Sequence, residues 1–179
     1  RKAMEDTVFQ ITNARLLSRV IESIENITSD GADMMGDVYE YMLGIMAASG
    51  TNGQFRTPRH IIRMMVELMR PTLNDTICDP AIGSAVFIME AAKFITEHQS
   101  DDLLNIGEGD RFRKEIFHGS DSDASMLRIG CMNMMLHDVD EPNLYYRNSL
   151  SDENNDTNRY TLCLANPPFA GSLDTDDIA

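Results

Sequence analysis

The tetrad Asn166-Pro167-Pro168-Phe169 has the residue types best suited to chemistry, and it follows directly after an apolar run at residues 160–165. Each proline fixes φ and lacks a backbone donor, so the carbonyls around it are left as acceptors. The Asn166 side chain adds another acceptor, and Phe169 offers a flat face for stacking. Such a site fits a planar amine, for example the exocyclic amino group of an aromatic base. A strand that ends in a proline turn is the simpler alternative.

An amino group on an aromatic ring is a poor nucleophile because its lone pair is delocalised into the ring. Acceptors that bind both of its N–H groups favour the pyramidal form, in which the lone pair is available. This is stabilisation of a transition state by preorganised dipoles. The tetrad therefore indicates a site that activates an amine as the attacking group.

Three further polar clusters also follow apolar runs. Asp79-Pro80-Ala81-Ile82-Gly83-Ser84 is a small-residue turn, which lets a ligand approach the backbone and the free N–H groups of the next helix. Its leading acid suits an ammonium-bearing ligand better than a pyrophosphate. Asp121, two residues after Gly119, is placed to accept both hydroxyls of a ribose, and Asp123 is a candidate helix cap. The Asn148 side chain can bond a nucleobase edge, although a simple turn is an open alternative there.

The elements that must position these clusters alternate along the chain. The apolar pattern predicts strands at residues 76–78, 116–119, 144–147 and 160–165, and helices at residues 84–98 and 124–137. Strands alternating with helices imply an α/β fold with a parallel sheet and right-handed crossovers. Ligands of such sheets bind beyond the carboxyl ends of the strands, where all four clusters lie. Together they predict a nucleoside cofactor beside an amine substrate.

A helical segment precedes the sheet, because apolar residues recur at helical spacing over residues 4–49 and residues 50–53 break the pattern. Thr57 is then a candidate N-cap, with Pro58 at the first position of a helix that runs to about Arg70. We expect this helix to bury one apolar face. The residues of that face are Ile61, Ile62, Met65, Leu68 and Met69.

The net charge of −14 bears on the partners of the chain. Acidic residues are concentrated in four expected loops, at residues 100–110, 138–141, 151–156 and 174–177. A protein that grips DNA by itself usually has a basic face, because phosphate contacts dominate affinity. If nucleic acid is the substrate, a partner or further sequence must supply most of the phosphate contacts.

The three cysteines, Cys78, Cys131 and Cys163, sit singly among apolar residues, which favours neither a metal site nor a disulfide. We expect them to be buried, reduced thiols in a cytoplasmic protein. No apolar run approaches the length of a membrane span, and no signal-peptide pattern is present. Because the sequence starts at Arg1 and stops ten residues after Phe169, we expect a fragment of a longer protein.

The motifs, taken in order, resemble those of the adenine-N6 DNA methyltransferases. They are Gly53-Gln54-Phe55-Arg56-Thr57-Pro58-Arg59, then residues 79–87, then Gly119-Ser120-Asp121, then the tetrad. The chain is most similar to the modification subunit of type I restriction-modification systems. The resemblance implies a Rossmann-like, S-adenosylmethionine-dependent methyltransferase fold, truncated after its fourth strand. It also implies two parts: residues 1–52, the end of an N-terminal helical domain, and residues 53–179, the first part of the catalytic domain.

The resemblance implies S-adenosylmethionine as cofactor and methyl transfer to N6 of a flipped-out adenine in DNA. The residues implied for the target base are Asn166, Pro167, Pro168 and Phe169. Those implied for the cofactor are Gln54, Phe55, Arg56, Thr57, Pro58, Arg59, Asp79, Gly83, Ser84, Ala85, Val86, Asp121 and Asn148. Within this set, residues 54–59 and 84–86 would line the methionine end, with Asp79 near the ammonium. Asp121 would bind the ribose and Asn148 would lie near the cofactor's adenine.

Four departures from the family pattern bear on the cofactor site. The family usually has an aromatic residue where this chain has Arg56, and often has Cys or Ala where it has Ile82. It usually has a glycine where this chain has Val86, and a β-branched side chain would crowd the cofactor if that position needs a positive φ. Asn148 commonly corresponds to an aspartate. We expect these changes to affect cofactor affinity more than the fold.

The partners implied are DNA, bound mainly through a specificity subunit, further copies of the modification subunit, and a restriction subunit, with no membrane. Two other functions stay open. The tetrad also suits methylation of a glutamine amide in a protein, although the segment at residues 54–59 favours DNA. An inactive scaffold of the same fold is the rival from another class, which Val86 and Asn148 favour. A nicotinamide dehydrogenase is disfavoured because the glycine fingerprint is absent.

Overall fold

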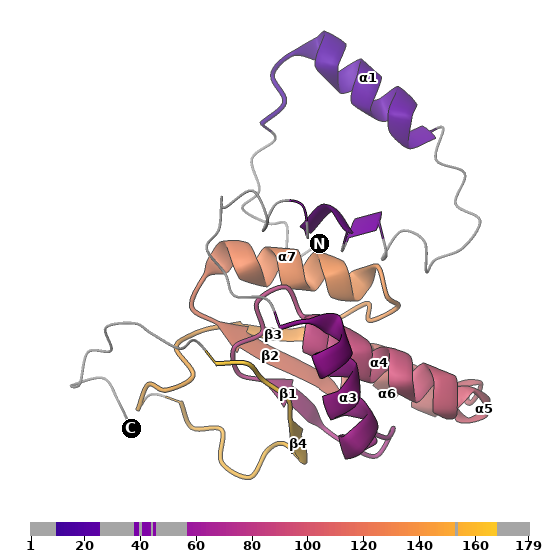
Figure 1. The fold of residues 1–179 in the computed structure, drawn as a ribbon, viewed down its shortest axis with the longest axis vertical. Coiled ribbons are helices and arrows are strands. Elements are labelled where there is room, and N and C mark those ends of the chain that lie inside the picture. Colours follow the sequence, from indigo (N-terminus) through magenta and orange to yellow (C-terminus); the bar gives the residue numbers. More distant parts are fainter. Residues whose placement is uncertain are drawn as a thin grey trace.

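The computed structural model describes residues 10–25, 38–39, 41–43, 45, 57–152 and 154–167. Its helices and strands follow in chain order, with the labels of Figure 1. They are α1 (Ala14–Glu25), α3 (Arg59–Met69), β1 (Ile77–Asp79), α4 (Val86–His98), α5 (Ser100–Leu103), α6 (Ile106–Lys114), β2 (Phe117–Asp121), α7 (Ala124–Met135), β3 (Asn143–Tyr146) and β4 (Leu162–Cys163).

The four strands form one sheet in the order β3-β2-β1-β4, and every neighbouring pair is parallel. The register aligns Cys78 of β1 with His118 of β2 and with Cys163 of β4. All four strands therefore end at the same edge. The predicted α/β class and the parallel sheet are confirmed, and the predicted strands differ from the observed ones mainly at their ends.

Helices cover one face of this sheet. Helix α4 packs against β1 and α3, while α7 packs against β2, β3 and α4, so these helices lie on the same side (Figure 1). Apolar side chains from both layers meet there in one core. Its members include Ile62, Val66, Ile77, Phe87, Ile88, Ala91, Ile95, Phe112, Phe117, Met134, Leu162 and Leu164.

The connection between β3 and β4 covers the other face with polar and aromatic groups. Along a strand, successive side chains point to opposite faces, so His118 points away from the core that holds Phe117. The His118 ring lies with its centroid 5.2 Å from that of Tyr160 and 6.4 Å from that of Tyr145. Ser149 reaches the same face, where its hydroxyl meets that of Ser120. The two faces of the sheet thus differ in chemistry.

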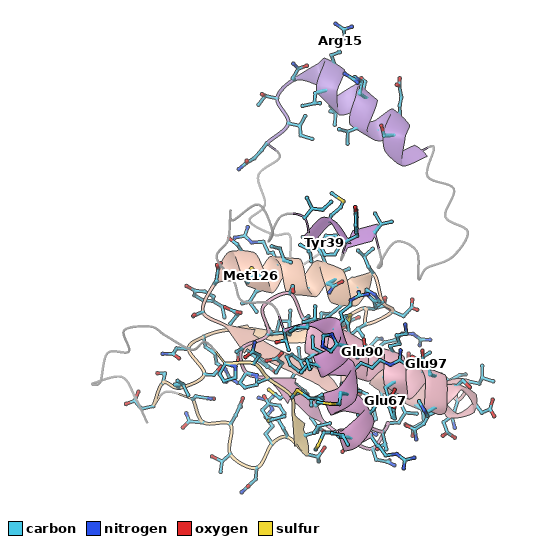
Figure 2. All side chains as sticks on the ribbon, viewed as in Figure 1. Arg15, Tyr39, Glu67, Glu90, Glu97 and Met126 are labelled. Carbon is cyan, nitrogen blue, oxygen red and sulfur yellow. The ribbon has the colours of Figure 1, made fainter. Side chains whose placement is uncertain are left out.

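Most of the described residues ahead of α3 are helical, at 14–25, 38–39, 41–43 and 45. In α1, Leu16 and Ile21 remain about half exposed, at 51% and 45%. Farther along, the Tyr39 hydroxyl donates to the carbonyl of Ile129 in α7, with 3.4 Å between the oxygens; Figure 2 labels Tyr39 beside this helix. The division of the chain at residue 52 stays a prediction.

The expected start of the helix after residue 57 is wrong. Helix α3 begins at Arg59, and Pro58 occupies the cap position with φ −57° and ψ 135° and with no side-chain cap. The carbonyl of Pro58 accepts from the backbone N–H groups of Ile61 and Ile62. Thr57 is not the cap, because its hydroxyl is bonded instead to Asn166.

The expected buried face of α3 is also only partly right. Ile62 and Val66, four residues apart, are the buried pair that faces α4, whereas Leu68 and Met69 are 74% and 54% exposed. The buried face of α3 is therefore rotated by about one residue from the predicted face, and it includes Val66, which the prediction omitted.

Two expectations based on charge and polarity need correction. Residues 100–110 are not a loop: they contain α5 and the start of α6, whose Asn105 cap accepts from Gly107 N. Acids in the first turn of a helix are favoured by the helix dipole, so Asp101 and Asp102 fit α5. Cys163 is exposed, unlike the buried Cys78 and Cys131, because it lies in β4, the last strand of the sheet order, whereas Cys78 lies in the central strand β1.

The turn after β1 crosses β2 at very close range. A Cβ on Gly119 would lie 2.2 Å from Cδ1 and 3.0 Å from Cβ of Ile82. Ile82 is buried at 2% exposure, and its N–H donates to the carbonyl of Ser120 at 3.0 Å. Only glycine at position 119 allows this approach.

We therefore expect Gly119→Ala to destabilise the fold by roughly 1–3 kcal/mol through overpacking. In an Ile82→Ala background, the same change should cost much less, because most of the clashing atoms are gone. Urea unfolding of the four proteins in a double-mutant cycle measures this coupling. An equal cost of Gly119→Ala in both backgrounds would contradict the close approach.

Candidate functional site

Residues predicted to do chemistry meet at the carboxyl edge of the sheet. Asp79 ends β1 and Asp121 ends β2, while Asn148 and Asn166 follow β3 and β4 by two and three residues. The register pairs Asp79 with Gly119 and Asp121 with Tyr146, so these strand ends are level to within a few residues. The parallel sheet thus gathers four clusters that are far apart in the sequence.

The strand order reverses at β1 on this edge of the sheet. From β1 the chain moves outward to β2 and β3, and then returns to place β4 on the other side of β1. In open parallel sheets, ligands bind where the strand order reverses in this way. Residues 80–85 after β1 and residues 164–167 after β4 flank that point. The topology therefore favours a ligand between these two segments.

Side chains and strands hold the loop at residues 80–85 in place. The N–H of Ala81 donates to Asp79 Oδ1 at 2.9 Å, and the N–H of Gly83 donates to Asp121 Oδ2 at 2.9 Å. Gly83 and Ala85 both have positive φ, at 52° and 65°. The loop is a fixed, partly strained turn, as is common at binding sites.

The backbone at Val86 differs from the one that would crowd the cofactor. Val86 is the first residue of α4 and has no positive φ, whereas Ala85 before it is the left-handed cap residue. The condition for crowding by the Val86 side chain is therefore not met. The backbone strain of this turn falls on Ala85, which is fully buried.

Helix α7 supports the same turn from behind. The Asn133 side chain, fully buried, donates from Nδ2 to the carbonyl of Ser84 at 2.8 Å. A Cβ on Gly130 would lie 2.8 Å from the carbonyl oxygen of Gly83. Sequence reasoning missed both residues, although a polar Asn133 among the apolar residues of a helix was a usable signal. They fix the start of α4 without reaching the site.

Asp121 joins the turn to the start of α7. Its Oδ2 accepts from Gly83, and its Oδ1 accepts from the N–H of Asp123 at 2.9 Å. Asp123 in turn accepts from Ser125 and Met126, so its expected role as a helix cap is confirmed. A carboxylate has about four lone-pair sites, so Asp121 keeps capacity for further donors. The ribose role of Asp121 stays a prediction.

Asp79 is a buried acid, with only 1% of its surface exposed. Burial raises its pKa to about 7, the bond from Ala81 lowers it, and the Asp121 carboxylate raises it. A carboxyl in this state gains most from a nearby cation, because a positive charge favours its ionised form. The site therefore favours a ligand with a positive group near the end of β1.

The segment before α3 meets the end of β4. Asn166 Nδ2 donates to Thr57 Oγ1 at 2.8 Å, across 109 positions of sequence. This bond brings part of the motif at residues 54–59 to part of the tetrad. Pro167 is exposed beside it.

The remaining predicted site residues are either exposed, at a helix start, or outside the described part of the chain. Asn148 is exposed, and its Oδ1 accepts from the N–H of Leu150 at 3.1 Å, which is the turn that was left open as an alternative. Arg59 is the first residue of α3. The residues that lie outside the described part of the chain are Gln54, Phe55, Arg56, Pro168 and Phe169.

The sequence of the chain decides its family. The N-6 DNA methylase family matches residues 30–179. The chain belongs to this family. Family membership agrees with the resemblance inferred from the four motifs, and its span includes every site residue named above.

Two relatives of this N-6 DNA methylase chain are methylase subunits of type I restriction enzymes. The EcoEI subunit of Escherichia coli is 29% identical over 96% of this chain and 35% of its own length. The StySPI subunit of Salmonella potsdam is 28% identical over 97% of this chain and 36% of its own length. The methylase chain thus spans about a third of these relatives.

Solved structures show the same fold. A modification subunit from Vibrio vulnificus matches with a TM-score of 0.76 at 28% identity, over 89% of this chain and 34% of that one. The EcoKI M protein matches with a TM-score of 0.62 at 26% identity, over 69% of this chain and 27% of that one. The predicted Rossmann-like methyltransferase fold is confirmed.

In the described part of the chain, no three His, Cys, Asp or Glu side chains are grouped to hold a metal ion. Among the same residues, no helix has the length and apolar character needed to span a membrane.

The raised pKa of Asp79 predicts that the protein loses folding stability as the pH rises. Between the ordinary aspartate pKa of about 3.9 and the folded value, the folded state binds more protons than the unfolded state, so stability falls as pH rises. Above about pH 7 the penalty is complete. Asp79→Asn should therefore be more stable than the unchanged protein at pH 8 by roughly 1–4 kcal/mol, at about 1.4 kcal/mol per pKa unit.

Urea unfolding at pH 8 and at pH 5 measures this difference, which should shrink at the lower pH. Asp140→Asn, at an exposed position, is the matched control and should shift stability little at either pH. A variant Asp79→Asn that is less stable than the unchanged protein at pH 8 would show that the buried carboxylate is favourable.

Proposed function

We propose that the chain transfers a methyl group from S-adenosylmethionine to N6 of adenine in DNA, as the modification subunit of a type I restriction-modification complex. The observation that carries the proposal is the Thr57–Asn166 contact at the point where the strand order reverses. It joins Thr57, the part of the motif before α3 that makes this bond, to Asn166 of the tetrad, in a chain of the N-6 DNA methylase family.

The residues present fit this cofactor. Helix α4 begins without a side-chain cap, so a ligand carboxylate suits the N–H groups of its first turn. The buried Asp79 suits an ammonium group, and Asp121 keeps lone pairs for the ribose hydroxyls. Asn148 would lie near the adenine. When bound, S-adenosylmethionine supplies an electrophilic methyl group on a positively charged sulfur.

The side chain of Asn166 would bind and orient the target amine. Because its Nδ2 donates to Thr57, its Oδ1 is left as the acceptor for one hydrogen of the amine. The carbonyl of Pro167 would accept the other hydrogen, and Phe169 would stack on the base. Two acceptors favour the pyramidal nitrogen, which is the nucleophilic form.

Proton transfer needs no strong base before attack. The cofactor, held by the loops that carry Asp79 and Asp121, would supply the methyl group and keep the electron pair of the carbon–sulfur bond, while Asn166 would hold the nitrogen that receives the methyl. The methylated nitrogen is then positively charged and loses a proton to an acceptor or to water. Positioning in line supplies much of the rate, which is why Asn166 and Thr57 matter more than a basic side chain.

DNA and partner subunits belong to the same proposal. The target adenine must leave the duplex to reach the tetrad, so base flipping is required. A chain with a net charge of −14 is poorly suited to hold DNA alone, which supports a specificity subunit that makes most phosphate contacts. Further modification subunits and a restriction subunit would complete the complex, in the cytoplasm. Residues 1–52 would end its N-terminal helical domain, and residues 53–179 would begin its catalytic domain.

The test separates transfer from cofactor binding. In the full-length protein with its specificity subunit, Asn166→Ala should lower the rate of N6-methyladenine formation by at least about 100-fold. Its affinity for S-adenosylmethionine, measured by calorimetry, should change by less than a few-fold. Thr57→Val should lower the rate as well, because Asn166 is no longer oriented, and Thr57→Ser should retain it.

Three outcomes would contradict the proposal. No binding of S-adenosylmethionine by the unchanged, folded protein would favour the scaffold function. Methylated glutamine in a protein, without N6-methyladenine, would assign the other amine substrate. A large loss of cofactor binding in Asn166→Ala would refute the role given to Asn166.

A further inference from the structure

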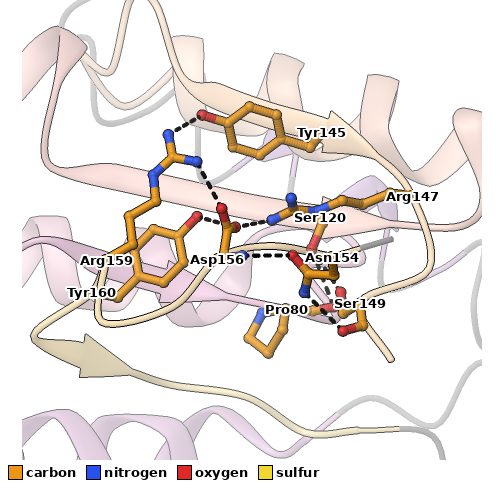
Figure 3. A network of polar contacts seen from close by, with 9 residues as sticks. All are labelled: Pro80, Ser120, Tyr145, Arg147, Ser149, Asn154, Asp156, Arg159 and Tyr160. Carbon is orange, nitrogen blue, oxygen red and sulfur yellow. Dashed lines mark hydrogen bonds and ion pairs between the residues drawn. The ribbon is translucent and has the colours of Figure 1, made fainter. Parts of the chain in front are cut away.

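Two serine hydroxyls join three strand ends on the polar face of the sheet. The Ser149 hydroxyl donates to the carbonyl of Pro80, and its oxygen lies 2.7 Å from that of the Ser120 hydroxyl (Figure 3). Pro80 follows β1, Ser120 lies in β2, and Ser149 follows β3. The contact between Ser149 and Pro80 spans 69 positions of sequence and crosses the strand between them.

The hydrogen bonds that join Pro80, Ser120 and Ser149 are called the serine tie below. The number of hydroxyl protons decides which oxygen is the donor in each of them. Each serine hydroxyl has one proton and two acceptor lone pairs. Because the Ser149 proton goes to Pro80, the Ser120 proton goes to the Ser149 oxygen, at 2.7 Å, rather than to the Pro80 carbonyl, at 3.5 Å. Ser120 is 1% exposed, so water does not compete for its proton. Ser149 is therefore the central member, and its loss breaks both bonds.

Each tied residue is the sequence neighbour of a proposed cofactor residue. Asp79 precedes Pro80, Asp121 follows Ser120, and Asn148 precedes Ser149. Ser120 and Asp121 are neighbours within β2, so their side chains point to opposite faces of the sheet. Ser149 thereby links all three loops that would bind the methionine end, the ribose and the adenine.

The tie is itself anchored to a charged cluster. The Asn154 side chain donates to the carbonyl of Ser149 at 2.9 Å and accepts from the N–H of Asp156 at 3.3 Å (Figure 3). Asp156 is paired with Arg147 and Arg159, and it accepts from the Tyr160 hydroxyl. The bond from Arg147 is the first cause that holds the pKa of Asp156 well below its usual range. The cluster stays charged at neutral pH and holds residues 156–160 against Arg147.

From this geometry we infer that Ser149 is a positioning residue for the cofactor site, acting through Pro80 and Ser120. The inference rests on the proposed function, since it concerns the same cofactor. Ser149 touches neither the cofactor nor the reacting atoms in this account. It sets the spacing of the loops that carry Asp79, Asp121 and Asn148.

Loss of the Ser149 hydroxyl would affect the turn after β1. The carbonyl of Pro80 and the buried hydroxyl of Ser120 would lose their short bonds to Ser149 and be left only with each other, at 3.5 Å. The turn can then shift toward a position that satisfies them, and the cofactor must pull it back on binding. Affinity for the cofactor should fall, while the rate at saturating cofactor should change little.

The experiment uses the purified full-length protein and S-adenosylmethionine as the probe. Ser149→Ala should weaken binding in calorimetry by roughly tenfold, the effect of losing about one good hydrogen bond. Its KM for S-adenosylmethionine should rise with kcat nearly unchanged. Ser149→Thr, which keeps the hydroxyl, should bind close to the unchanged protein.

A matched control lies at the opposite edge of the same sheet. The Thr161 hydroxyl donates to Asp75 Oδ1 at 2.8 Å and accepts from the N–H of Thr76 at 2.9 Å, at the amino ends of β1 and β4. Thr161→Val removes two hydrogen bonds at the other edge of the sheet, away from the cofactor residues. It should lower the melting temperature, because Asp75 and Thr76 lose a partner, yet leave the affinity for S-adenosylmethionine unchanged.

The outcomes distinguish this inference from the proposed function. If the unchanged protein binds S-adenosylmethionine and Ser149→Ala binds it equally well, the positioning role is refuted and the proposed function stands. An equal loss of affinity in Ser149→Ala and Thr161→Val would show a merely structural effect and would also refute it. If the unchanged protein does not bind the cofactor, both the inference and the proposed function fail.

Discussion

The pairing of β1 with β2 on one side and with β4 on the other is the interaction on which the rest of the structure depends. It puts β1 in the middle of a parallel sheet, so the turn after it lies between residues that come much later in the sequence. Asp121 reaches that turn from β2 by accepting from Gly83. Asn166 follows β4 and meets Thr57. A different strand order would separate these groups even if each local segment kept its shape.

The carboxyl edge concentrates features that oppose stability. Asp79 is buried with a raised pKa, and Ala85 adopts a positive φ without being glycine. Around them, the structure supplies support from both faces of the sheet. Asn133 holds the carbonyl of Ser84 from α7, and Ser149 holds that of Pro80 from the polar face. Such a rigid surround is what a preorganised binding site requires, because the loops need not reorganise when a ligand arrives.

Much of this arrangement could be predicted because strand ends and helix caps are local signals. Asp123 caps α7 as its sequence position indicates, and the four polar clusters do lie at one edge. Thr57 was misassigned because its partner, Asn166, is 109 positions away, and a tertiary bond outweighed the local preference for capping. The acids at residues 100–110 suggested a loop, yet Phe112 is buried and draws α6 onto β2. Ser149 could not have been found at all, because nothing local shows that its hydroxyl reaches Pro80.

The central claim is that a nucleoside cofactor lies across this edge, with its two ends in the loops after β1 and β2. A crystal structure of the full-length protein with S-adenosylhomocysteine tests it most directly. The account predicts the amino acid end beside Asp79 and the first turn of α4, and the ribose hydroxyls on Asp121. Density for the ligand at any other place, or a ribose that makes no bond to Asp121, would contradict the account.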